Sequence, residues 1–272
     1  MAFDEITTHL FAVLITSFAY GIAACLFVQS IMTMVRRRRL TGQVSWTLAI
    51  PSVAIFIFAS VNALGIWAYF YWAILVYPGG PQAYFGLVRT PCKTAYQTGQ
   101  LGAIMLTDLL MIYRTYILWD SNFYSIVIPC LTFVATFISG VIFVHIEHVL
   151  AVTTSIFESS ITRWTISFLL CSFATTVYST GLIAYRLWNM DRKIRAVGVS
   201  TRPSVGYRIA TILVESAAIY STMHLLYAIL YLLKSNVEAT PSYLVCYSPH
   251  LSPLQLLIDS CRKQALQASP AA

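Results

Sequence analysis

The chain has 272 residues, of which 58% are hydrophobic and only 10% are charged, and its mean hydropathy is +0.72. A water-soluble domain cannot be this apolar, because polar groups must cover much of its surface. The net charge of +7 does not indicate nucleic-acid binding, because the basic residues lie beside apolar segments, where they meet anionic lipid headgroups. The composition therefore predicts an all-α, polytopic (multi-pass) protein of the lipid bilayer.

Six apolar stretches are long enough to cross a bilayer, which takes about 20 apolar residues in helical form. They lie near residues 9–35, 46–74, 97–119, 124–146, 164–187 and 207–233. A seventh candidate at 243–258 is weaker, because it has only 16 residues and contains Pro249 and Pro253. The loops are too short for a separate soluble domain. We therefore expect residues 1–272 to form one transmembrane helical bundle with six clear spans and a weak or truncated seventh.

Basic residues lie on alternate sides of these stretches. Thirteen of the 17 are at the ends of the first, third, fifth and seventh stretches: Arg36, Arg37, Arg38, Arg39, Arg114, Arg186, Arg192, Lys193, Arg195, Arg202, Arg208, Arg262 and Lys263. The other side has only Arg89, Lys93, Arg163 and Lys234. Because cytoplasmic loops collect Lys and Arg, we expect the N-terminus outside and loops 36–45, 119–123 and 188–207 inside, next to anionic inner-leaflet lipids. The plasma membrane is the expected location.

Polar side chains recur at helical spacing inside three of the stretches, where such residues usually face other helices or a cavity. The candidates of the third, fifth and sixth stretches are, in that order, Gln97, Gln100, Asp108 and Arg114; Ser172, Thr176, Ser179 and Arg186; and Glu215, Tyr220 and His224. In one interpretation, hydrogen bonds among them only hold the helices together. In the other, they line a polar cavity for a small ligand or an ion.

Two narrower expectations concern the ionisable members of this set. Asp108 shares its side of the helix with Gln97, Gln100 and Thr115, which predicts that it faces the bundle and not the lipid. We also expect Asp108 and Glu215 to meet Arg114 and Arg186 in a polar lock on the cytoplasmic side, because a charge inside a membrane needs a partner.

No pattern typical of catalysis or metal binding stands out. The sequence from His145 to His148 contains two histidines and Glu147, but on a helix the glutamate points away from the face that the histidines share. No serine lies in a nucleophile-elbow motif. We therefore expect no catalytic residue, no metal site and no cofactor.

Three segments carry a resemblance: residues 108–119 (DLLMIYRTYILW), 185–188 (YRLW) and 215–220 (ESAAIY). They resemble the large family of uncharacterised seven-span membrane proteins of mushroom-forming (basidiomycete) fungi. The resemblance covers most of residues 10–235 and implies fold and lineage, since the family has no established activity. Helix count and orientation also resemble G-protein-coupled receptors, by analogy of architecture alone.

The end of the chain departs from the pattern of this family. Its members tend to begin the seventh span with Gly-Ile and to end it with Leu-Ile-x-x-Arg, whereas this chain has Pro249, His250 and Pro253 there. We expect a mispredicted exon or a shifted reading frame; a genuine short tail with an altered last span is the alternative. Both predict a broken, loosely attached segment with little burial from Tyr243 onward.

The orientation and the polar stripes favour a receptor-like protein that senses a small extracellular ligand or the state of the membrane. The sequence does not specify its intracellular partner. A transporter or channel is one alternative, although inverted repeats and paired broken helices are not evident. A lipid-handling membrane enzyme is another, weakened by the missing nucleophile and histidine motifs.

Overall fold

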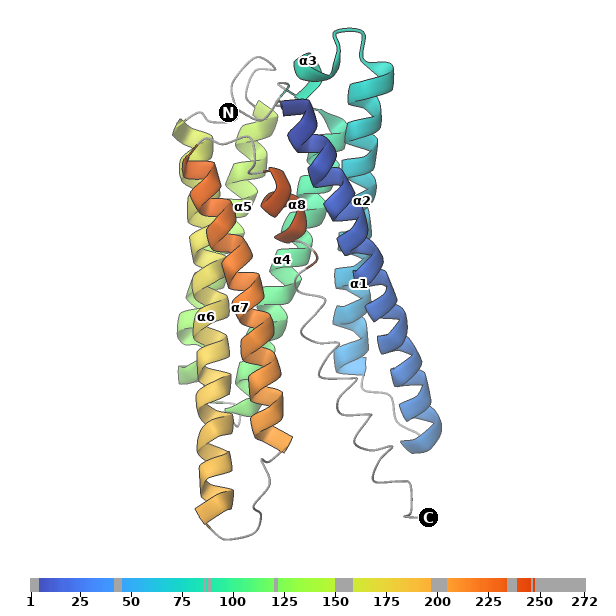
Figure 1. Ribbon diagram of the computed structural model, residues 1–272. Coiled ribbons are helices and arrows are strands. Elements are labelled where there is room, and N and C mark those ends of the chain that lie inside the picture. Colours follow the sequence, from blue (N-terminus) through green and yellow to red (C-terminus); the bar gives the residue numbers. More distant parts are fainter. Residues whose placement is uncertain are drawn as a thin grey trace.

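The protein is a bundle of long helices in the computed structural model (Figure 1). The structure describes residues 5–41, 46–85, 87, 90–119, 122–149, 159–196, 205–233, 239–245 and 247. Its elements are α1 (Glu5–Thr41), α2 (Trp46–Tyr71), the π-helical turn η1 (Trp72–Val76), α3 (Pro81–Phe85), α4 (Pro91–Leu118), the 3-10 turn η2 (Phe123–Ser125), α5 (Val127–Val149), α6 (Ser159–Ala196), α7 (Val205–Leu232) and α8 (Ala239–Val245). Within these described ranges there is no β-strand.

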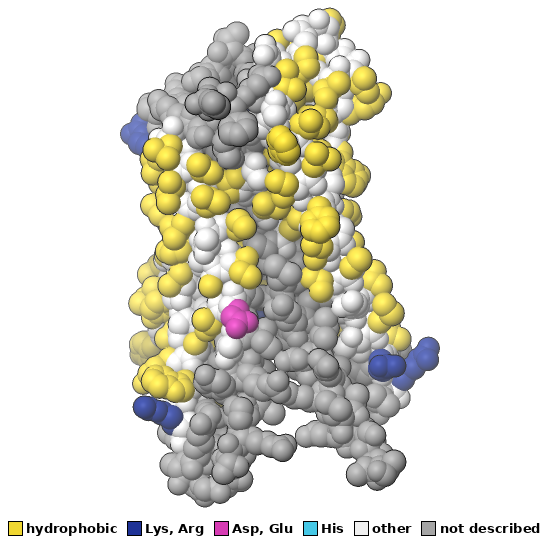
Figure 2. Space-filling model, viewed as in Figure 1, with side chains coloured by type: hydrophobic (Ala, Val, Ile, Leu, Met, Phe, Trp, Pro, Cys, Tyr) yellow, Lys and Arg dark blue, Asp and Glu magenta, His cyan; other side chains and the backbone are white. Residues whose placement is uncertain are grey.

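Five of the helical segments are long and apolar enough to cross a membrane. They are Ile6–Arg36, Ala49–Val76, Pro91–Leu118, Val127–Ile146 and Thr162–Met190, and α7 adds the shorter apolar stretch Ala217–Leu232. Large hydrophobic side chains such as Phe18 and Leu131 are exposed, and hydrophobic groups are spread over the helices on the face in Figure 2. Lipid can cover such a surface, whereas water cannot do so without a large cost. The described residues thus confirm the prediction of a helical protein whose long apolar helices can span a membrane.

Helix α4 connects the two halves of the bundle. It packs against α2 on one side and against α5 and α6 on the other, while α6 also packs against α7. Helices α1, α4 and α6 run in one direction, and α2, α5 and α7 return in the other (Figure 1). Because every long helix must satisfy its own backbone hydrogen bonds in lipid, the way in which side chains fill the seams between helices decides the packing.

Glycines allow α2 and α4 to approach each other closely. A Cβ added to Gly99 of α4 would lie 2.8 Å from the backbone nitrogen of Asn62 and 2.9 Å from the carbonyl oxygen of Phe58, both on α2. Reciprocally, a Cβ added to Gly65 of α2 would lie 2.8 Å from the backbone nitrogen of Tyr96 on α4. Membrane helices commonly use small residues in this way, because van der Waals contact replaces the hydrophobic effect between them.

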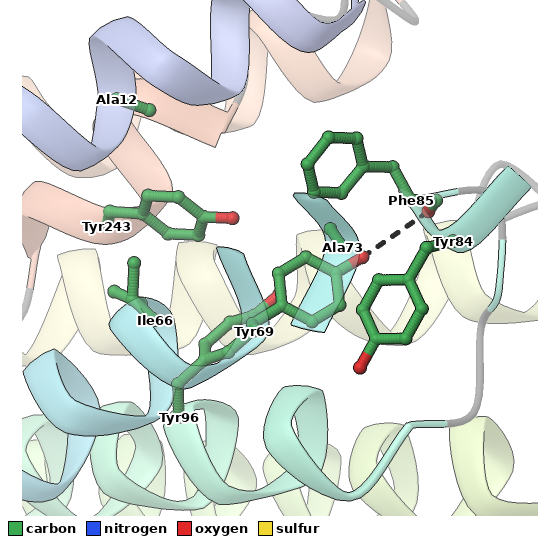
Figure 3. Packing of buried hydrophobic residues seen from close by; sticks show 8 residues of the cluster. All are labelled: Ala12, Ile66, Tyr69, Ala73, Tyr84, Phe85, Tyr96 and Tyr243. Carbon is green, nitrogen blue, oxygen red and sulfur yellow. Dashed lines mark hydrogen bonds between the residues drawn. The ribbon is translucent and has the colours of Figure 1, made fainter. Parts of the chain in front are cut away.

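An aromatic cluster fills the bundle near α3, at the end where α1 and α4 begin (Figure 3). Its eight buried residues are Ala12, Ile66, Tyr69, Ala73, Tyr84, Phe85, Tyr96 and Tyr243. The Tyr69 hydroxyl donates to the Phe85 carbonyl at 3.4 Å, and the rings of Tyr96 and Tyr243 meet edge to face with centroids 5.5 Å apart. The cluster joins α1, α2, η1, α3, α4 and α8, and the offset and edge-to-face ring pairs stabilise it.

The C-terminal segment is not loosely attached, so that expectation was wrong for the residues that the structure describes. Tyr243 is 3% exposed and Tyr247 is 4% exposed, and α8 packs against α1 and α7. The expectation treated 243–258 as a failed span, yet α8 begins earlier, at Ala239. Two helical turns are enough to place tyrosine rings inside the bundle without crossing a membrane. Residues 248–258, and with them the question of a gene-model error, lie outside the described residues.

Candidate functional site

A buried carboxylate lies where α4 meets α6. Asp108 of α4 is 0% exposed. Its Oδ2 accepts a hydrogen bond from the Ser172 hydroxyl at 2.8 Å, and its Oδ1 accepts one from the Thr176 hydroxyl at 3.4 Å. Both donors come from α6, where they are one helical turn apart, so one carboxyl group connects two successive turns of that helix. The prediction that Asp108 faces the bundle is confirmed.

Helix α7 extends this network through Tyr220. The hydroxyl groups of Tyr220 and Ser172 are 3.4 Å apart, and Tyr220 is 3% exposed. One turn further along α7, Nδ1 of His224 lies 3.0 Å from the Tyr220 carbonyl oxygen, and the two rings are 4.2 Å apart. His224 is 1% exposed, and its Nε2 is buried without a hydrogen-bond partner in the part of the chain that the structure describes.

We call Asp108, Ser172, Thr176, Tyr220 and His224 the polar cluster. Its surroundings are apolar, since Ile104, Leu169 and Ala228 belong to the same buried core. A charge at the centre of a bilayer costs roughly 2.5–3.5 kcal/mol on insertion scales, and two hydroxyl donors offset only part of it. A carboxyl group kept in such a place must therefore be neutralised, by a proton or by a cation.

The remaining polar candidates of α4 and α6 divide between different neighbours. Gln100 is buried, but its amide donates to the Ser242 carbonyl oxygen in α8 at 2.9 Å and is not part of the polar cluster. Gln97 is half-buried. Ser179 of α6 is 0% exposed, and its hydroxyl has no hydrogen-bond partner within the described ranges. The polar side chains on this face of α4 thus have different partners: Gln100 bonds to α8, and Asp108, two turns further along, bonds to α6.

The polar lock expected on the cytoplasmic side does not form as predicted. Glu215 is exposed, whereas Asp108 is fully buried and bonded to hydroxyl groups. Arg186 instead lies over the Trp119 ring, with its guanidinium carbon 5.4 Å from the ring centroid. In Arg114, Nη1 is buried and has no hydrogen-bond partner among the residues that the structure describes. The prediction failed because equal depth in the membrane does not bring side chains together when they point to different sides of their helices.

Sequence reasoning missed Asn62, which is 0% exposed in α2. Its amide nitrogen donates to the Tyr96 carbonyl oxygen at 2.9 Å, and its amide oxygen accepts from the Tyr247 hydroxyl at 3.0 Å. Within α8, which ends two residues before Tyr247, the Tyr243 hydroxyl is 3.3 Å from Nδ1 of His9. The available signal was a single asparagine inside an otherwise apolar span, since such a residue needs an internal partner.

The histidine-rich segment at the end of α5 lies only partly within the described residues. His145 is exposed, and the side chains of Glu147 and His148 lie outside the described residues. Within the part of the chain that the structure describes, no group of three or more His, Cys, Asp or Glu side chains is placed to hold a metal ion.

Comparisons with known proteins show no relative: no family model matches the chain, and no curated protein matches it. The resemblance to the seven-span fungal proteins therefore stays a prediction.

Proposed function

We propose that this chain is a receptor-like, multi-pass protein of the plasma membrane, with its N-terminus outside and with the seven-segment plan of the fungal family that it resembles. It would sense a small extracellular ligand or the state of the membrane. The observation that carries this proposal is the polar cluster, because it connects α4 to α6 through the Asp108 carboxylate and α6 to α7 through the Ser172 and Tyr220 hydroxyl groups. A small change at such a junction shifts three helices relative to one another, which is what a receptor requires.

The distribution of basic residues supports the proposed orientation. Arg36 and Arg39 lie at the end of α1, Arg114 near the end of α4, and Arg186 and Arg192 near the end of α6. These three helices run in the same direction (Figure 1), so their arginine-bearing ends belong to one side of the bundle. That side would face the cytoplasm and its anionic lipids.

Cysteine labelling tests the orientation. Single cysteines introduced at loops 36–45, 119–123 and 188–207 of a cysteine-free background should resist an impermeant thiol reagent on intact cells and react after permeabilisation. A cysteine in the turn at Gly79 should react on intact cells. Labelling of the 188–207 loop from outside would overturn the topology.

A paired assay tests the activity. A ligand found by its effect on thermal stability should produce a signal in cells that express the protein, and Asp108→Asn should reduce that signal while Leu109→Ala preserves it. Leu109 is the neighbouring residue and is 49% exposed, so it reports on nonspecific effects of substitution. Net flux of the ligand in liposomes without signalling would favour a transporter, and its chemical turnover by purified protein would favour an enzyme.

A further inference from the structure

The described residues do not balance the charge of the Asp108 carboxylate. Its hydrogen bonds in this part of the chain come from Ser172 and Thr176, which are both neutral. Arg114 is six residues further along α4, which places it about 9 Å along the axis and about 240° around the helix. The network therefore supplies donors to the carboxylate but no positive charge.

Oxygen atoms continue along the same two helix faces. Ser179 follows Ser172 by seven residues on α6, and Thr115 follows Asp108 by seven residues on α4, so each pair lies within about 20° on its helix. Ser179 and Thr115 are both 0% exposed. Because α4 and α6 run in the same direction and pack together, we infer that these rows follow one oxygen-lined seam, in which the Thr115 hydroxyl donates to the Met111 carbonyl oxygen of its own helix at 2.9 Å.

Several buried polar atoms of α4, α6 and α7 have no hydrogen-bond partner among the described residues. They include the Ser179 hydroxyl oxygen, one turn beyond Thr176, Nε2 of His224, one turn beyond Tyr220, and Nη1 of Arg114, which points to another side of α4 than Asp108 by helical rotation. Buried polar groups are nearly always satisfied, so each such exception calls for an explanation. The Ser179 hydroxyl is a second observation, independent of the carboxylate, because its oxygen is buried and can accept a cation as well as a hydrogen bond.

We propose that the oxygen-lined seam between α4 and α6 binds one sodium ion, with the Asp108 carboxylate and the Ser172 and Thr176 hydroxyl oxygens as its ligands and Ser179 one turn deeper. Hard cations prefer carboxylate and hydroxyl oxygens, and a single carboxylate balances a single positive charge. Calcium and magnesium sites commonly use more oxygen ligands or retain several waters. Ile104 and Leu169, which are 0% and 1% exposed, place this site inside the bundle.

This cation site goes beyond the proposed receptor role and does not depend on it. A sodium ion here would hold α4 against α6 whether or not the protein signals. Its release would leave the carboxylate to take up a proton or to lose its contacts with α6.

Direct binding of radioactive sodium to the purified full-length protein tests the site, with Ser139→Ala as a matched control. Ser139 is a buried serine of α5, 3% exposed, whose hydroxyl bonds to backbone carbonyls of its own helix. We expect saturable binding of about one ion per chain. Asp108→Asn should weaken it more than tenfold and Ser172→Ala severalfold, while Ser139→Ala leaves it unchanged.

Thermal unfolding provides a second readout. At constant pH and ionic strength, sodium at ten times its Kd should raise the Tm of the wild-type protein by roughly 3–6 °C over N-methylglucamine. Asp108→Asn should remove this difference, and if that variant does not fold, Ser172→Ala should reduce it. The proposal fails if wild-type protein binds no sodium saturably, or if its Tm depends on pH alone and is equal in the two cations, since the carboxyl group then holds a proton.

Discussion

The two sides of α4 are held to their neighbours by different means. Toward α2, Gly99 brings backbone against backbone, with Asn62 and Phe58 at the contact. Toward α6, Asp108 makes hydrogen bonds to Ser172 and Thr176. The α2 side depends on shape and leaves no room for added volume, whereas the α6 side depends on hydrogen bonds between polar side chains. One helix thus combines van der Waals fit and polar contacts, the two means by which membrane helices associate.

Added volume at the α2 side should have the largest effect. Gly99→Leu would place side-chain atoms where the α2 backbone lies, and a backbone cannot move as a flexible side chain can. We expect a loss of about 3 kcal/mol or more in the free energy of unfolding, measured by denaturation in detergent. Gly21→Leu is the matched control, because a Cβ at Gly21 meets nothing within 4 Å. Equal losses for the two variants would mean that the α2–α4 contact is not close.

Loss of the Asn62 amide, on the α2 side, should have the second-largest effect on the free energy of unfolding. Asn62→Leu leaves the Tyr247 hydroxyl and the Tyr96 carbonyl without this partner inside the protein, which should cost about 2 kcal/mol. Tyr247→Phe removes only the hydroxyl bonded to Asn62. Because the two residues share one contact, the double variant should lose less than the two single variants together. Strict additivity in unfolding measurements would contradict the docking of the C-terminal segment.

Loss of the acceptor on the α6 side should cost less. Asp108→Ala removes the bonds from Ser172 and Thr176, but hydroxyl groups in helices can turn to the carbonyl four residues earlier. We therefore expect a loss of about 1 kcal/mol, while Leu109→Ala stays within about 0.5 kcal/mol. Equal melting temperatures for the two variants would show that the hydrogen bonds between Asp108 and α6 do not stabilise the bundle.

The smallest effect should come from the edge of the aromatic cluster. Tyr243→Phe keeps the ring that packs on Tyr96 and removes the hydroxyl that meets His9. The expected loss is about 0.5–1 kcal/mol, whereas Tyr243→Ala should cost about 3 kcal/mol by removing the ring. If the two substitutions lower the melting temperature equally, the packing of α8 is not what secures the segment.

Sequence alone determined the helices and the direction of some side chains. Long apolar stretches must be helical in lipid, because no water is available to satisfy their backbone groups. All six predicted stretches lie on helices: α1, α2 with η1, α4, α5, α6 and α7. The 100° rotation per residue also identified Asp108 as inward-facing, since that angle is a property of a single helix.

Tertiary structure decided which inward-facing groups meet. Gln100 and Asp108 belong to one stripe, yet Gln100 bonds to α8 and Asp108 to α6. Glu215 was expected in a polar lock with the arginines and is exposed, while Asn62 was overlooked and is fully buried. Periodicity fixes the direction of a side chain around its own axis. Its partner depends on how neighbouring helices are rotated and offset along their lengths, which glycine contacts such as that of Gly99 and the docking of α8 set over long sequence distances.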